Sequence, residues 1–224
     1  MTSESLEKFQ EDVAKKRRAF AQARAIIQRA KNAGIPNKYI RIRQDEFEPL
    51  LCPKYHNAKV FADSIYKNPN ALFNKSYIII DGGDVDSRKV AAFAVLFRMI
   101  ACDSYGYTTD CGELSSEFQS LNYKGENRND LVKRMQKQQI LLLHEFHIRK
   151  FNVHLTDSGL FFDQLLSFRD DYSKPTIFTF SSPLSNGTSN QENVIRDDRC
   201  GVYMAKLSRA DIEKNPKVLR IRLK

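Results

Sequence analysis

A glycine-rich turn between an apolar run and a helical segment is the part of this sequence best suited to chemistry. Residues 77–93 read YIIIDGGDVDSRKVAAF. In a nucleotide-binding loop, glycines let backbone N–H groups surround phosphates, a lysine reaches the outer phosphates, and a following Ser or Thr holds Mg²⁺. Aligned on Lys89, the pattern G-x-x-x-x-G-K-[ST] keeps Gly83 but has Arg88 at the second glycine and Val90 at the hydroxyl position. The spacing predicts a nucleotide loop with two of its four fixed residues replaced.

A carboxylate follows the next apolar run, in QQILLLHEFH (138–147). A Mg²⁺-dependent ATPase has Asp-Glu after such a run, where the Asp orients metal-bound water and the Glu polarises the attacking water. Here His144 and Glu145 occupy the two positions. A third run, KPTIFTFSS (174–182), ends at Ser181, where a residue that senses the γ-phosphate is expected.

The order of these motifs resembles the AAA+ helicase loaders of the DnaC, DnaI and IstB type. The family has a segment AGIP-x-x-[YF] followed by a Phe, and this segment is similar to AGIPNKY (33–39) and Phe47 here. A later part of the family pattern begins with "DE" and ends with "PTI-x-TSN", and residues 144–182 resemble that part. The resemblance covers residues 30–182. It implies an α/β, AAA+-like P-loop NTPase fold with three layers, a mainly parallel sheet and an N-terminal helix. It also implies ATP with Mg²⁺ as cofactor, Glu145 assisting hydrolysis, Arg196 or Arg199 as an arginine finger, and nucleotide contacts from Gly82, Gly83, Arg88, Lys89, Val90, His144 and Ser181.

Departures from the family pattern argue against efficient ATP hydrolysis. Arg88 replaces a glycine whose missing side chain lets the backbone curl around phosphate. Val90 offers no hydroxyl and His144 no negative charge for Mg²⁺. Asp84 and Asp86 fall within the expected loop Gly83–Lys89, and two like charges ~4 Å apart repel by about 4 kcal/mol at an effective dielectric of ~20. We therefore expect weak ATP binding and little turnover.

Neither a metal site nor a disulfide is expected. His144, Glu145 and His147 are not spaced as H-E-x-x-H, and on a strand positions 144 and 147 face opposite ways. The four cysteines form no C-x-x-C pair, so reduced thiols are expected; they are Cys52, Cys102, Cys111 and Cys200.

The elements that must position these motifs alternate between strand and helix. Apolar runs predict strands, amphipathic stretches predict helices, and this alternation is typical of an α/β fold with a mainly parallel sheet. Expected strands are 76–81, 107–111, 139–143, 175–181, 200–207 and 218–223; expected helices are 88–104, 127–137 and 156–171; a flexible loop is expected at 183–199. Arg169, near the end of the third helix, is expected to meet a partner or form a surface pair.

A long helix is expected at 4–33, ended by Gly34 and Pro36. Its narrow apolar stripe suits docking on another helix, with packing on its own domain as the alternative; the stripe is Leu6, Phe9, Val13, Phe20 and Ile27. We therefore divide the chain into a basic, partner-docking helix (1–37) and an AAA+-like α/β domain (38–224).

The net charge of +9 belongs to the two ends of the 224-residue chain. Residues 1–43 carry eleven Lys and Arg against four Asp and Glu, and residues 206–224 carry seven against two. Such asymmetry favours contact with a polyanion. The candidate single-stranded DNA contacts are Lys15, Lys16, Arg17, Arg18, Arg41 and Arg43.

Together these features predict a replication accessory protein that binds a replicative helicase, resembles a helicase loader and contacts single-stranded DNA, with self-association through the core. No apolar stretch reaches the ~20 residues of a membrane span, so a cytoplasmic protein is expected, in the host cytoplasm if it is phage-encoded. Three alternatives stay open: an active ATP-dependent loader, an IstB-like transposition ATPase, and a binding-only antagonist of a host loader.

Overall fold

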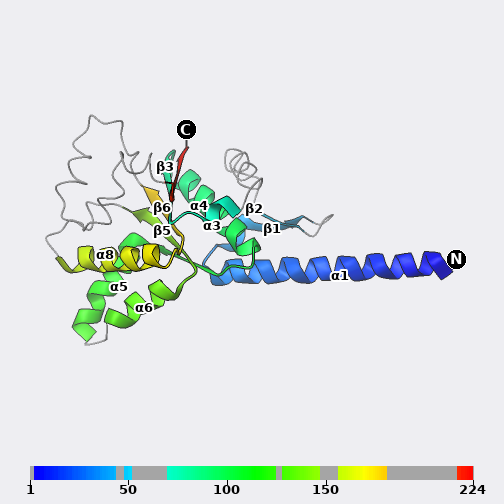
Figure 1. Ribbon diagram of the computed structural model, residues 1–224, viewed down its shortest axis with the longest axis horizontal. Helices are drawn as coiled ribbons and strands as arrows, with labels where there is room; N and C mark the ends of the chain where they lie inside the picture. The colour runs from blue at the N-terminus through cyan, green and yellow to red at the C-terminus, as the bar shows by residue number, and fades with distance from the viewer. Residues whose placement is uncertain are drawn as a thin grey trace.

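A five-stranded, all-parallel sheet lies between two layers of helices (Figure 1). The computed structural model describes residues 3–43, 48–51, 70–124, 128–146, 156–180 and 216–223. The strand order is β4-β5-β6-β3-β7, with β3 at Tyr77–Gly82, β4 at Gly106–Asp110, β5 at Ile140–Phe146, β6 at Thr176–Phe180 and β7 at Val218–Leu223. The predicted three-layer α/β fold is therefore confirmed.

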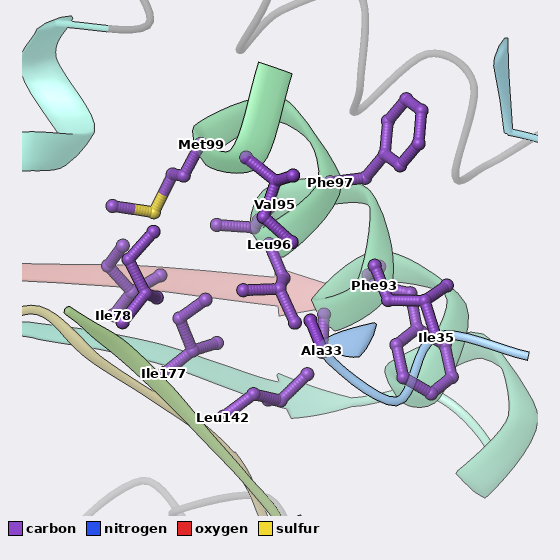
Figure 2. Packing of buried hydrophobic residues seen from close by; sticks show 14 of the residues in the cluster. Ala33, Ile35, Ile78, Phe93, Val95, Leu96, Phe97, Met99, Leu142 and Ile177 are labelled. Carbon is purple, nitrogen blue, oxygen red and sulfur yellow. The ribbon is translucent and has the colours of Figure 1, made fainter. Parts of the chain in front are cut away.

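Helices cover both faces of the sheet, which explains why its central strands are apolar without alternation. On one face, α4 (Val85–Ala101) and the end of α1 (Ser3–Asn32) pack on Ile78 and Ile80. On the other face, α5 (Cys111–Lys124), α6 (Arg128–Lys137) and α8 (Thr156–Asp171) pack on Tyr77 and Ile79. Figure 2 shows the core between α4 and the sheet, where Leu96 and Met99 of α4 lie over Ile78, Leu142 and Ile177 of the sheet.

The end of α1 is fixed by its sequence. Gly34 has φ +89°, its N–H donates to the Lys31 carbonyl at 2.9 Å, and the Ile35 N–H donates to the Ala30 carbonyl at 3.0 Å. This pair of bonds is a Schellman cap, which requires a left-handed residue that glycine adopts without strain. Ala30, Ala33 and Ile35 are buried members of the core, and Figure 2 shows Ala33 and Ile35 on the side of Phe93. The cap therefore joins the long helix firmly to the α/β domain.

A small antiparallel hairpin follows α1, made of β1 (Ile40–Arg43) and β2 (Glu48–Leu51). It is preceded by a 3-10 turn, η1 (Asn37–Tyr39), and β3 is preceded by a short helix, α3 (Asn70–Phe73). The expected loop at 183–199 and strand at 200–207 lie outside the described residues. Within the ranges that the structure does describe, no helix is long and apolar enough to cross a membrane.

Arg169 corrects one expectation from the sequence. It is fully buried at 0% exposure, so it forms neither a surface pair nor a partner contact. Its guanidinium donates to the carbonyls of Met135, Gln138, Gln139 and Pro175 and to Thr176 Oγ1, at 2.6 to 3.4 Å. Burial lowers its pKa to about 9. Arg169 therefore ties α6 and α8 to the start of β5 and β6.

Candidate functional site

The turn after β3 is shorter than a nucleotide loop. α4 begins at Val85, three residues before the expected start, because Asp84 caps it: the Ser87 N–H donates to Asp84 Oδ1 at 2.6 Å. This hydrogen bond lowers the pKa of the Asp84 carboxyl. Lys89 thus lies in the second turn of the helix rather than in a loop. Five of the seven residues of Gly83–Lys89 are therefore helical, which leaves Gly83 and Asp84 as the turn.

The two glycines of this turn serve the sheet. Gly82 and Gly83 have φ of +78° and +59°. A Cβ on Gly82 would lie 2.3 Å from the Leu223 carbonyl oxygen, and a Cβ on Gly83 would lie 3.1 Å from Leu223 Cβ. The edge strand β7 pairs with β3 up to Gly82 and Leu223. The glycines are therefore needed for the approach of β7, whether or not a phosphate binds.

Arg88 fills the space beside the turn. Its side chain is 3% exposed; its Nη1 donates to the Gly83 carbonyl at 2.8 Å and to the Gly82 carbonyl at 3.3 Å. Its Nε and Nη2 donate to the two carboxylate oxygens of Glu145 at 3.3 and 3.1 Å. This fork-to-fork pair satisfies both charges. It brings together two residues that the sequence assigned to nucleotide binding and hydrolysis.

Glu145 is held from a second side by Thr179, a residue that the sequence analysis did not single out. The Glu145 N–H donates to Thr179 Oγ1 at 2.8 Å, and the Thr179 hydroxyl donates to Glu145 Oε1 at 3.3 Å. Glu145 has φ +50°, a conformation that is unfavourable for a non-glycine residue. The signal for Thr179 was its position near the end of the third apolar run.

These residues do not fit a triphosphate with Mg²⁺. The side chain of Arg88 fills the space beside Gly82 and Gly83, where a nucleotide loop has a glycine without a side chain. Glu145 is already paired and cannot activate water without losing Arg88. Val90 is 2% exposed within the core. No catalytic step through ATP follows from this arrangement.

Lys89 and His144 line a different cavity, of about 360 Å³, between the start of α4 and the segment after α1. The cavity is also lined by Thr108, Asp110 and Tyr39. Among the residues that the structure describes, none forms a hydrogen bond with either ring nitrogen of His144 or with Thr108 Oγ1. Burial, and then the charge of Lys89, lowers the pKa of His144 to about 4, so the imidazole is neutral at pH 7 and does not replace an anionic magnesium ligand.

Several predicted residues lie outside the described part of the chain, namely Ser181, Arg196, Arg199, His147, Cys52 and Cys200. In the part that is described, no group of three or more His, Cys, Asp or Glu side chains could hold a metal ion. Of the two described cysteines, Cys102 is exposed and Cys111 is buried, and both are in the thiol form.

The predicted docking stripe of α1 is only partly used by the domain. Phe9 is 60% exposed and Phe20 40% exposed. Val13 and Ile27 are half-buried, and the structure does not describe the side chain of Leu6. α1 extends well beyond the other labelled elements, so its N-terminal end is far from the sheet (Figure 1).

The predicted DNA contacts lie on two elements. The four consecutive basic residues at 15–18 are exposed on α1; Arg41 and Arg43 belong to β1, and their side chains are not described. The basic C-terminal segment is partly used within the protein. Arg220 pairs with the buried Asp81, and Lys217 lies 3.9 Å from Asp170. Any polyanion site is therefore expected to depend on α1 more than on β7.

Several solved structures resemble this chain. A crystal structure of the DnaC helicase loader matches with a TM-score of 0.54 and 17% identity, over 84% of this chain and 100% of that one. A DNA replication initiation factor matches with a TM-score of 0.52 and 12% identity, over 78% of this chain and 50% of that one. The chain therefore spans half the length of the initiation factor.

At these identities the likeness concerns the fold. No protein-family model and no curated protein sequence matches the chain. The strand order and the structural matches lead to one conclusion: this chain has the three-layer α/β fold, with an all-parallel five-stranded sheet, that is seen in the DnaC helicase loader.

Proposed function

We propose that this protein is an accessory factor of DNA replication that binds a replicative helicase through α1 and uses its α/β domain as a scaffold without hydrolysing ATP. The observation that carries the proposal is the Arg88–Glu145 pair, which occupies the turn after β3 and satisfies the carboxylate that hydrolysis would need. The fold shared with a helicase loader supports the replication role.

The exposed aromatic residues of α1 support the docking role. Phe9 and Phe20 are exposed on α1, and the N-terminal end of this helix lies far from the sheet (Figure 1). Large exposed apolar side chains that share one face are typical of interaction sites. Exposed basic residues on the same helix support an additional contact with single-stranded DNA, which must weaken as salt rises.

Deletion of residues 1–21 tests the docking role. This deletion removes Phe9 and Phe20 but keeps Ala23, Ala30 and Ala33, which are buried against the domain. We expect the shortened protein to stay folded, with a helical circular dichroism spectrum and cooperative unfolding. In gel filtration, it should no longer associate with the replicative helicase of its own cell or host. Retained association would contradict the docking role of α1.

A further inference from the structure

We infer that the exposed half of α1 is a docking surface for an acidic amphipathic helix of the partner protein. This inference rests on the proposed function and deepens it, because it states which chemistry the partner must present. It is carried by three features of α1: an apolar line, a basic flank beside that line, and acidic residues on the opposite side.

The apolar line is formed by Phe9, Val13 and Phe20. Phe9 and Phe20 are eleven residues apart, which is about three turns and places them within about 20° of each other around the helix. Val13 lies between them and is half-buried. A shallow groove on the surface of this half of the helix is lined by Phe9, Gln10, Val13, Ala14, Arg17 and Arg18. An apolar side chain of another helix would fill such a groove.

The contact of α1 with its own domain uses another side of the helix. Ala23 and Ala30 are buried and Ile26 packs against the core; these three residues lie about 40 to 100° around the helix from Phe9, away from Val13. Among the described elements, α1 contacts β2, β4 and α4. Beside these contacts, Phe9 is still 60% exposed and Phe20 40% exposed.

Charges around the line specify the partner. Arg17 and Arg24 are exposed and lie about 60 to 80° from Phe9 on the side of Val13. Glu7 and Glu11 lie on the back of the helix, about 160 to 200° from Phe9. A partner that covers the apolar line meets the arginines and avoids the glutamates. A helix with an apolar stripe bordered by Asp or Glu fits this surface best.

The apolar line disfavours a nucleic acid on this face, because phosphates are bound by basic side chains and would leave Phe9 and Phe20 exposed. Asp12 is exposed on the other border of the line, about 60° from Phe9, so the acidic side of the partner helix is expected on the border that carries the arginines. A strand of DNA would instead follow the basic residues around the helix, whichever side they occupy.

Arg17 and Lys15 form a matched pair for the test. Both are exposed and basic, but Lys15 lies about 120° from Phe9 on the side away from Arg17. We would measure binding of full-length Arg17→Glu, Lys15→Glu and Phe9→Ala variants to the replicative helicase by surface plasmon resonance. Equal circular dichroism spectra would show that each variant is folded. We expect about a tenfold or greater loss of affinity for Arg17→Glu and Phe9→Ala, and a change below about twofold for Lys15→Glu.

The other outcomes separate the two proposals. If deletion of residues 1–21 abolishes binding while Arg17→Glu does not weaken it, the helicase partner holds and the acidic helix is refuted. Equal losses for Lys15→Glu and Arg17→Glu, with matching losses on a dT25 oligonucleotide, would overturn the inference in favour of a nucleic acid. A wild-type chain that does not bind the helicase would refute both.

Discussion

Replacement of Arg88 by Met should cost far more stability than the loss of an ordinary ion pair. Arg88 is 3% exposed and its partner Glu145 17% exposed. Removing one partner of a buried pair costs about 3 to 5 kcal/mol, because the other charge stays buried. Glu145 keeps some contact with water, so we expect about 3 kcal/mol. Met preserves the apolar stem, which limits the effect to the lost charge and to the bonds to the Gly82 and Gly83 carbonyls.

The Arg134–Glu117 pair is the matched control. It is an arginine–carboxylate pair at 2.6 Å, but its side chains are 49% and 42% exposed. Exposed pairs contribute about 0 to 1 kcal/mol, so Arg134→Met should have little effect. Urea unfolding followed by circular dichroism would give both losses. In the Arg88→Met/Glu145→Gln double variant, the loss of unfolding free energy should be smaller than the sum of the two single-variant losses, by about 1 to 3 kcal/mol. Equal losses for Arg88→Met and Arg134→Met would refute the buried pair.

Three further predictions concern the same edge of the sheet. Gly82→Ala should lower the urea midpoint without any ligand, since its Cβ would meet the Leu223 carbonyl oxygen; an unchanged midpoint would mean that β7 does not constrain this turn. His144 has a folded-state pKa of about 4 against 6.5 when unfolded, so the unfolded state binds more protons between these values and stability should fall as pH drops from 6.5 to 4. His144→Leu should remove that dependence, and a persistent slope in this variant would assign it elsewhere. The pKa of Asp84 is lowered from 3.8 by the Ser87 N–H, so its stabilisation is present above pH 3.8 and is lost as pH falls through the folded pKa. The Tm difference between wild type and Asp84→Ala should therefore shrink in acid, and a constant difference would exclude the cap as its source.

The sheet and most helices were predictable because their signals are local. Continuous apolar runs marked β3, β5 and β6, and the sequence AGIP marked the end of α1 through a glycine and a proline. The helix α5 was missed, since Gly112 and three serines weaken its apolar period. Gly112 is tolerated because its N–H donates to Asp110 Oδ1 at 2.7 Å, which fixes the first turn.

The site was predictable in its residues but not in its geometry. Gly83 and Arg88 follow one apolar run and Glu145 follows another. Because the carboxyl ends of parallel strands meet at the same edge of a sheet, the sequence placed all three residues at that edge. It could not show that Asp84 caps α4 and so shortens the turn, because an Asp before a helix and an Asp in a loop look alike in sequence. Nor could it show that Arg88 pairs with Glu145 across 57 positions, since that contact depends on the order of the strands.

Calorimetric titration of the full-length chain with ATP and Mg²⁺ tests the central claim most directly. Arg88 and Glu145 close the turn on each other, so the protein is expected to give no saturable heat with nucleotide up to about 1 mM, a level that corresponds to about 4 kcal/mol of binding free energy. A saturable titration with a Kd near 1 µM, about 8 kcal/mol, would contradict the account, because nucleotide would then have displaced Arg88 or bound beside it.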